Sequence, residues 1–172
     1  NVFDDDEETM HVRAINLISD SPTLNFMLGE TSVASSVGYV SGSSFSPAPP
    51  GTYDVQLRAT RPPFIDDDDD TTNNDEYTDP IPLGTPISLS FQRDTDYTLI
   101  AYGTVANPQL IVMSGTGLRE ELEDNTHVWQ LVHAATNVGA VEIYITSEDM
   151  GIPSRQFLTT LNPTQHSEPT VW

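Results

Sequence analysis

The sequence predicts an all-β protein in which two sheets pack face to face. Apolar and polar residues alternate with a period of two over residues 53–59, the pattern of a strand with one buried face. Pro49, Pro50 and Gly51 precede this strand and set where it begins. The same alternation recurs at residues 87–91 and 97–101. Because each strand has one apolar face, a second sheet must cover it.

Five further segments complete the predicted elements of the first part of the chain. Residues 10–18 are almost continuously apolar and predict a strand covered on both faces. Residues 23–28 predict the next strand, and the small residues of 32–45 predict one or two short, weak strands. Residues 109–113 predict the last strand, and residues 117–124 form the only plausible helix, of a turn or two.

Composition excludes several classes of function. The chain has 172 residues with 37% hydrophobic content, enough for one full core and part of a second. Its net charge of -20 opposes binding to nucleic acids and to anionic membrane surfaces. Lysine and cysteine are both absent, which removes lysine nucleophiles, disulfides and cysteine zinc sites. No apolar run approaches the roughly 20 residues of a membrane span, so we expect no membrane insertion.

Charge and composition divide the chain into four parts. Residues 1–9 predict an acidic tail, and residues 10–117 predict a β-sandwich domain that includes an acidic loop at 66–79. Residues 118–126 are read as a linker. Residues 127–172 predict a partial second β unit, with strands at 128–134 and 140–146, and the first of these is expected to be the companion of the second.

The second unit is an incomplete repeat of the first. With an offset of 117, residues 14–17 align with 131–134, and residues 24–27 align with 141–144. The polar residues Asn16 and His133 coincide in this alignment. About 46 residues remain after Thr126, enough for two or three strands rather than a whole sandwich.

Several of these segments resemble a known family. Val-His-Ala-Ala at 132–135 followed by Val-Glu-Ile-Tyr at 141–144 resembles the opening of domain of unknown function 4397, and residues 13–29 resemble the same opening. Pro-Gly-Thr-Tyr-Asp-Val at 50–55 is similar to a later segment of that family, and residues 96–103 to its closing strand. The resemblance implies an immunoglobulin-like antiparallel β-sandwich, found in tandem in exported and cell-surface proteins, with no known catalytic residues.

The acidic loop is the candidate metal site. Asp66, Asp68 and Asp70 have the opening spacing of a calcium-binding EF-hand, and calcium prefers six to eight oxygen ligands. Thr71 stands where that motif needs glycine, and Tyr77 where it needs the closing glutamate, so this is no EF-hand. Two readings stay open: a solvated acidic loop with no cofactor, or an irregular calcium or intersubunit cation site.

Catalytic motifs are absent from the sequence. Residues 38–42 resemble a Gly-x-Ser-x-Gly nucleophile motif, but the serine stands one place late. His127 and His133 fall on one side of a strand, yet six residues separate them by roughly 20 Å, too far to share a metal. We read His133 as a packed or hydrogen-bonded strand residue. The sequence therefore predicts a protein that is not an enzyme.

Self-assembly is the predicted role. The partial unit exposes backbone groups and an apolar face, which missing downstream residues, the chain's own first domain or a neighbouring chain must cover. A neighbouring chain would give a head-to-tail filament, because a heterologous contact that does not close keeps adding subunits. The predicted assembly residues are Val128, Leu131, Val141, Ile143 and Ile145.

The sequence thus favours a secreted or cell-surface structural or adhesive building block that binds other copies of itself. An alternative reading is a cell-surface module that binds carbohydrate, such as a surface polysaccharide, or calcium through the acidic loop.

Overall fold

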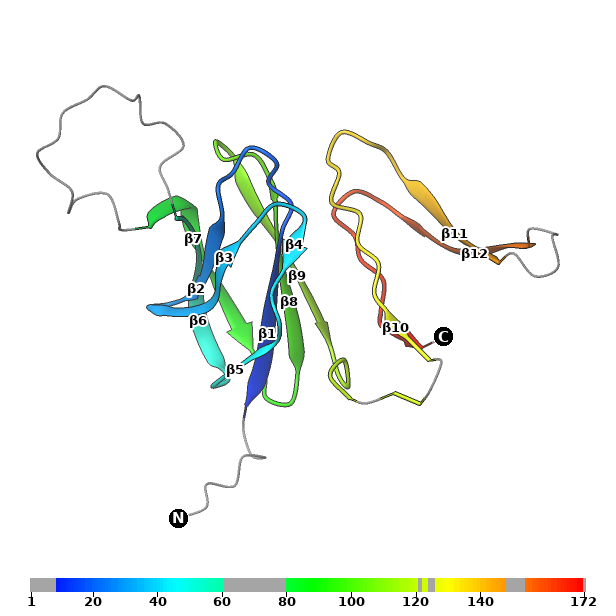
Figure 1. The fold of residues 1–172 in the computed structure, drawn as a ribbon, viewed down its shortest axis with the longest axis horizontal. Coiled ribbons are helices and arrows are strands. Elements are labelled where there is room, and N and C mark those ends of the chain that lie inside the picture. The colour runs from blue at the N-terminus through cyan, green and yellow to red at the C-terminus, as the bar shows by residue number, and fades with distance from the viewer. Residues whose placement is uncertain (1–8, 61–79, 121, 124–125, 148–153, 172) are drawn as a thin grey trace, which may run out of the picture. The chain divides into compact units, whose positions relative to one another are not determined.

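A computed structural model describes residues 9–60, 80–120, 122–123, 126–147 and 154–171. All regular structure in these ranges is β, so the all-β prediction is confirmed (Figure 1). The helix predicted at 117–124 is not formed over residues 117–120, where Glu120 N donates to Gly117 O at 3.3 Å in a turn. The chain divides into two compact units, residues 1–120 (unit 1) and 121–172 (unit 2).

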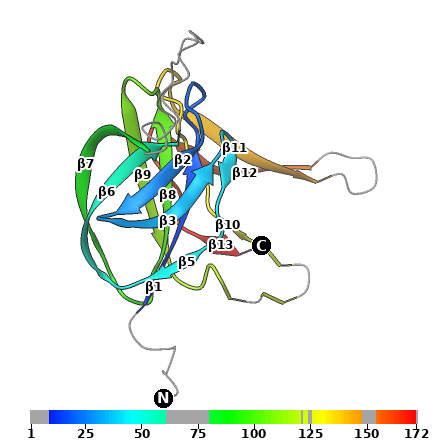
Figure 2. The same cartoon turned by 60° about the vertical axis from the view of Figure 1, so that its left-hand side comes forward.

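Unit 1 contains two sheets, which Figure 2 shows from a second side. The first sheet has the order β4-β1-β8-β9, and β5 also pairs with β1. Its strands are β1 (Met10–Asn16), β4 (Ser41–Gly42), β5 (Ser46–Ala48), β8 (Asp96–Gly103) and β9 (Pro108–Gly115). The second sheet has the order β3-β2-β6-β7. Its strands are β2 (Leu24–Leu28), β3 (Thr31–Val37), β6 (Gly51–Ala59) and β7 (Ile81–Phe91).

β1 alternates between fully and partly buried side chains. Met10, Val12 and Ala14 are completely buried, whereas His11 and Arg13 on the other face are partly buried. The predicted cover on both faces is therefore complete on one face only. β1 runs antiparallel to β4 and β5 but parallel to β8. One edge of β1 thus meets the segment after β3, and the other edge meets a strand from much later in the chain.

β6 has the predicted apolar face, with Val55, Leu57 and Ala59 buried. Gln56 lies between them in sequence, on the face predicted to be polar, yet it is also buried. Its Nε2 donates to Leu83 O at 3.1 Å, beside a shift in the β6–β7 register between Val55 and Leu57. The amide therefore satisfies a carbonyl at an irregularity that the alternation alone could not predict.

β7 is an edge strand that begins at Ile81, six residues earlier than predicted. Pro82 and Pro86 lie within it, and proline has no N–H to donate to a further strand. Gly84 has φ +67, and a Cβ there would lie 2.9 Å from Pro108 Cγ, so the position requires glycine. Because prolines and glycine interrupt the alternation of apolar and polar residues, the sequence pattern did not predict the first half of the strand.

Asn16, like Thr98, is a polar residue of unit 1 with no exposed surface. Its Oδ1 accepts from Ile18 N at 2.9 Å, and its Nδ2 donates to Val37 O and to Ser21 Oγ at 3.1 Å each. The side chain therefore closes the loop after β1 and joins it to the end of β3. Without the Asn16 side chain, the buried Ile18 N would lose this hydrogen-bond acceptor, and an unpaired buried polar group is costly.

We predict that Asn16→Leu lowers the free energy of unfolding by about 1–3 kcal/mol, because the change leaves buried polar groups without partners. Urea unfolding would measure the shift in midpoint. Asn107→Leu at an exposed turn is the control and should change stability by less than about 0.5 kcal/mol. Equal effects of the two changes would show that the Asn16 hydrogen bonds contribute nothing.

Unit 2 consists of four strands paired two by two. β10 (Val128–Trp129) pairs with β13 (Thr170–Val171), and β11 (Val141–Ser147) pairs with β12 (Ser154–Leu161). The predicted pairing of the first two strands with each other is wrong, because each pairs with a C-terminal strand instead. β11 and β12 follow each other in the chain and pair antiparallel, so their contacts are local and cost little chain entropy to form. An isolated antiparallel bridge between Val132 and His166 lies, in sequence, between the two strand pairs.

Candidate functional site

The strand order of unit 2 repeats the first half of unit 1. In unit 1, β1 is followed by the β2–β3 hairpin, and the chain then returns to pair with β1 through β4 and β5. In unit 2, β10 is followed by the β11–β12 hairpin, and the chain returns to pair with β10 through β13. Strands corresponding to β6, β7, β8 and β9 do not occur in the described residues of unit 2.

The residues that form the core in unit 1 have uncovered counterparts in unit 2. With the offset of 117, Val12 corresponds to Trp129, and Phe26 on β2 corresponds to Ile143 on β11. Val12 and Phe26 are completely buried. Trp129 is 41% exposed, and Ile143 is only partly buried. We call this side of unit 2 its inner face, defined by Trp129, Leu131, Val141, Ile143 and Ile145.

Unit 1 shows how such a face becomes covered. β6 pairs antiparallel with β2 along the edge opposite β3, with Phe26 beside Leu57. β8 pairs with β1 along the edge opposite β4 and β5. The equivalent edges of β11 and β10 carry no third strand in the part of the chain that the structure describes. Unit 2 therefore has both an apolar face and two strand edges available to a partner.

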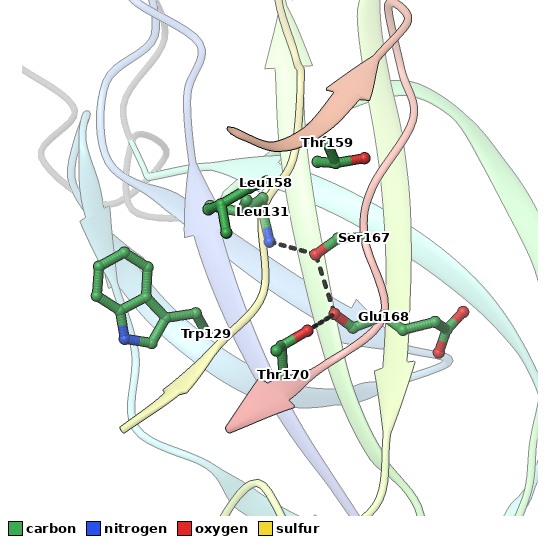
Figure 3. Close-up of a pocket in the computed structure, with 7 residues that line it drawn as sticks. All are labelled: Trp129, Leu131, Leu158, Thr159, Ser167, Glu168 and Thr170. Atoms are coloured by element: carbon green, nitrogen blue, oxygen red, sulfur yellow. Dashed lines mark hydrogen bonds between the residues drawn. The ribbon is translucent and has the colours of Figure 1, made fainter. Parts of the chain in front are cut away.

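A pocket of about 300 Å³ opens on unit 2. Figure 3 shows Leu131 and Leu158 close together at its centre, with the Trp129 ring to one side. Ser167 Oγ accepts from Leu131 N at 2.9 Å, which joins the segment after β10 to the segment before β13. The Glu168 carboxylate points away from the leucines. The pocket therefore combines three apolar side chains with four polar residues on a hydrogen-bonded frame.

His133 occupies the same place in unit 2 as Asn16 in unit 1. It is 6% exposed, and its Nε2 donates to Gly139 O at 2.9 Å across the loop that follows. Its backbone N donates to Gln165 O at 2.9 Å, and its carbonyl accepts from Thr164 N at 2.7 Å. His133 is packed and hydrogen-bonded as predicted, but it lies outside a strand, because β10 ends at Trp129. Both units therefore close the loop after their first strand with a buried polar side chain.

The comparison with known families gives one match. The family described as domain of unknown function (DUF4397) has a model that matches residues 10–144, from the start of β1 into β11. The chain belongs to this family. No curated protein matches the chain. The DUF4397 match spans all the described strands of unit 1, β10 and the first part of β11, so it includes the beginning of the repeat.

The structure brings only some of the predicted assembly residues of this DUF4397 chain together. Leu131 lines the pocket, whereas Val141, Ile143 and Ile145 lie on β11 outside it, and all of them are partly buried. Val128 corresponds to His11, on the opposite face of its strand from Trp129. Sequence reasoning missed Trp129, Leu158, Ser167 and Thr170, which also line the pocket. The offset of 117 places Trp129 on Val12 and could have found it.

The predicted cation ligands lie outside the described residues. Asp66, Asp68 and Asp70 fall within residues 61–79. Over the described ranges, no group of three or more His, Asp or Glu side chains is arranged to hold a metal. The same ranges contain no long apolar helix of the kind that crosses a membrane.

A second polar cluster surrounds Asp96 in unit 1. This carboxylate is 3% exposed, and its Oδ1 accepts from Arg119 Nε at 2.7 Å while its Oδ2 accepts from Leu118 N at 3.0 Å. His11 Nδ1 lies 3.9 Å from Asp96 Oδ1. The carboxylate therefore holds the turn after β9 against the start of β8, and its role is structural.

Burial lowers the pKa of His11, and the positive charge of Arg119 lowers it further. Asp96 acts in the opposite direction but does not outweigh them. Because the folded pKa lies below the unfolded one, the unfolded chain binds more protons. His11 therefore lowers stability as pH falls through the window below about 6.5.

We predict that Arg119→Gln raises the pKa of His11, because the change removes a positive charge beside the ring. Titration of the His11 ring protons by NMR would measure the shift, with His11→Gln to assign the signal. Arg93→Gln is the matched control, since the Arg93 side chain is 68% exposed and pairs with Asp94. An unchanged His11 titration in Arg119→Gln would contradict this account of the cluster.

Proposed function

We propose that this chain is a non-enzymatic building block, exported to the cell surface or extracellular space, that self-associates through the inner face of unit 2. The observation that carries the proposal is the contrast between the two units. Residues that are completely buried in unit 1 have counterparts in unit 2 that are partly or largely exposed. A structural or adhesive role follows, because this surface offers apolar contact and strand edges rather than reactive groups.

A pair of strands with one apolar face is marginal in water, and stability requires further strands or a packed partner. Every chain carries one unit 2, so other copies of the chain are available to complete it. Completion by another copy therefore couples the stability of unit 2 to association. If two different surfaces met head to tail, the contact would repeat without closing and build a filament.

Export is supported by composition rather than by a site. The chain is acidic and lacks lysine, and its net charge of -20 keeps isolated chains apart in solution. The family resemblance to exported and cell-surface proteins points the same way.

A carbohydrate-binding module is the second candidate, because Trp129 is exposed at the rim of an open pocket beside Ser167 and Thr170. An aromatic ring with nearby hydroxyls suits a sugar ligand. The offset alignment favours assembly over this reading, since it places Trp129 and Leu131 on residues that form a core in unit 1. A surface polysaccharide that binds the parent chain but not Trp129→Ala would favour the sugar.

We predict that Ile143→Asp abolishes self-association and leaves unit 1 folded. The change places a charge on the inner face, where burial without a partner costs several kcal/mol. Sedimentation velocity would measure the mass of the chain in solution, and circular dichroism would report the strands of unit 1.

Thr136→Asp provides the matched control, because it introduces the same charge at an exposed residue of the loop between β10 and β11. This variant should associate as the parent does. Association of Ile143→Asp at the strength of the parent would overturn the proposal, as would a parent chain that stays monomeric at all concentrations.

A further inference from the structure

The partner that completes unit 2 can be inferred from the direction of the missing strands. In unit 1 the strand beside β2 is β6, which runs antiparallel to it. The free edge of β11 therefore calls for an antiparallel strand with an alternating apolar face. β11 itself has this pattern, with Val141, Ile143 and Ile145 on the inner face.

A two-fold axis perpendicular to the sheet makes two β11 strands antiparallel by symmetry. It also keeps the inner face of both copies on the same side of the joined sheet, so both apolar faces contribute to one core. The edge of β10 takes no part in this contact. The corresponding edge of β1 pairs with β8 in parallel, whereas a two-fold axis would make two β10 strands antiparallel.

Charge also favours this contact. Two copies of a chain with net charge -20 repel each other unless the surfaces that meet carry little charge. Residues 126–147, which contain β10 and β11, include Glu142 as their single Asp, Glu, Lys or Arg residue. A contact formed through β11 therefore brings few charges close together. The remaining repulsion comes from charges farther away on the two chains, and salt screens that repulsion.

We propose that unit 2 of one chain pairs with unit 2 of a second chain about a two-fold axis, through the free edges of β11, so that the two β11–β12 pairs form one sheet with a shared apolar face. This inference rests on the proposed function and specifies its geometry. The contact is isologous and closes at two chains, in place of the head-to-tail filament expected from the sequence.

Engineered cysteines can test the symmetry, because the natural chain contains none. Glu142, Tyr144 and Thr146 alternate with the inner-face residues and so lie on the opposite face of β11. Glu142→Cys, Tyr144→Cys and Thr146→Cys would be oxidised singly and in pairwise mixtures of the full chain. In a two-fold antiparallel pair, the residue on the axis lies opposite the same residue of the second chain. The residues before and after it lie opposite each other. Disulfide-linked dimers are therefore expected only in the single variants or mixtures whose residues are opposite each other about one position of the axis.

Thr160→Cys on β12 is the matched control. Three strand spacings, roughly 14 Å, would separate the two β12 strands across the axis. A disulfide needs Cα atoms within about 7 Å, so this variant should stay unlinked. Circular dichroism would confirm that each variant keeps its strands, and a variant that lost them would be replaced by the two remaining β11 positions, alone and mixed.

The solution mass of the parent chain separates the possible failures. A mass of two chains together with the linked set supports the two-fold contact, and added salt should strengthen the association. Larger assemblies, or association without a disulfide in any single variant or mixture, would overturn the two-fold contact while self-association stood. A monomer at all concentrations and salt levels would overturn both proposals.

Discussion

Burial of the apolar side chains of β1 and β2 is the constraint on which the structure of unit 1 depends. These two strands carry Val12, Leu24 and Phe26, which have no exposed surface. Their burial requires β6 and β8, which join them from later in the chain. Such long-range pairings cost loop entropy before they contribute contacts. Unit 2 has the first two strands without the later ones, so the same constraint is unmet there within the described residues.

The sequence predicted the strands whose two faces differ clearly. β6 was visible because Val55, Leu57 and Ala59 alternate with polar residues, and the repeat was visible because polar Asn16 and His133 align. The first half of β7 was not, because its prolines and Gly84 read as loop. β12 and β13 were missed since their apolar residues are few and Phe157 is 51% exposed. Strand partners in unit 2 were also missed, because alternation gives the faces of a strand and not its neighbours.

Arginine is scarce in this chain, and two of the arginines of unit 1 contact buried polar groups rather than the acidic surface. Arg119 pairs with the buried Asp96, while Arg13 donates to Thr98 Oγ1 at 2.9 Å and its guanidinium lies 4.7 Å from the centre of the Phe45 ring. Burial lowers the pKa of Arg13, against the influence of Asp96. Most of the negative charge of the chain is therefore not neutralised by arginine. It remains as a repulsion between one copy of the chain and another.

The two prolines of β7 bear on how large an aggregate this protein can form. A sheet grows when each added strand finds donors and acceptors on the last one, and Pro82 and Pro86 remove two donors from the outer strand of unit 1. Growth by strand addition is thus hindered at that end of the second sheet. A chain that keeps an open strand edge in one unit and has prolines on an edge of the other can associate without growing into a large aggregate.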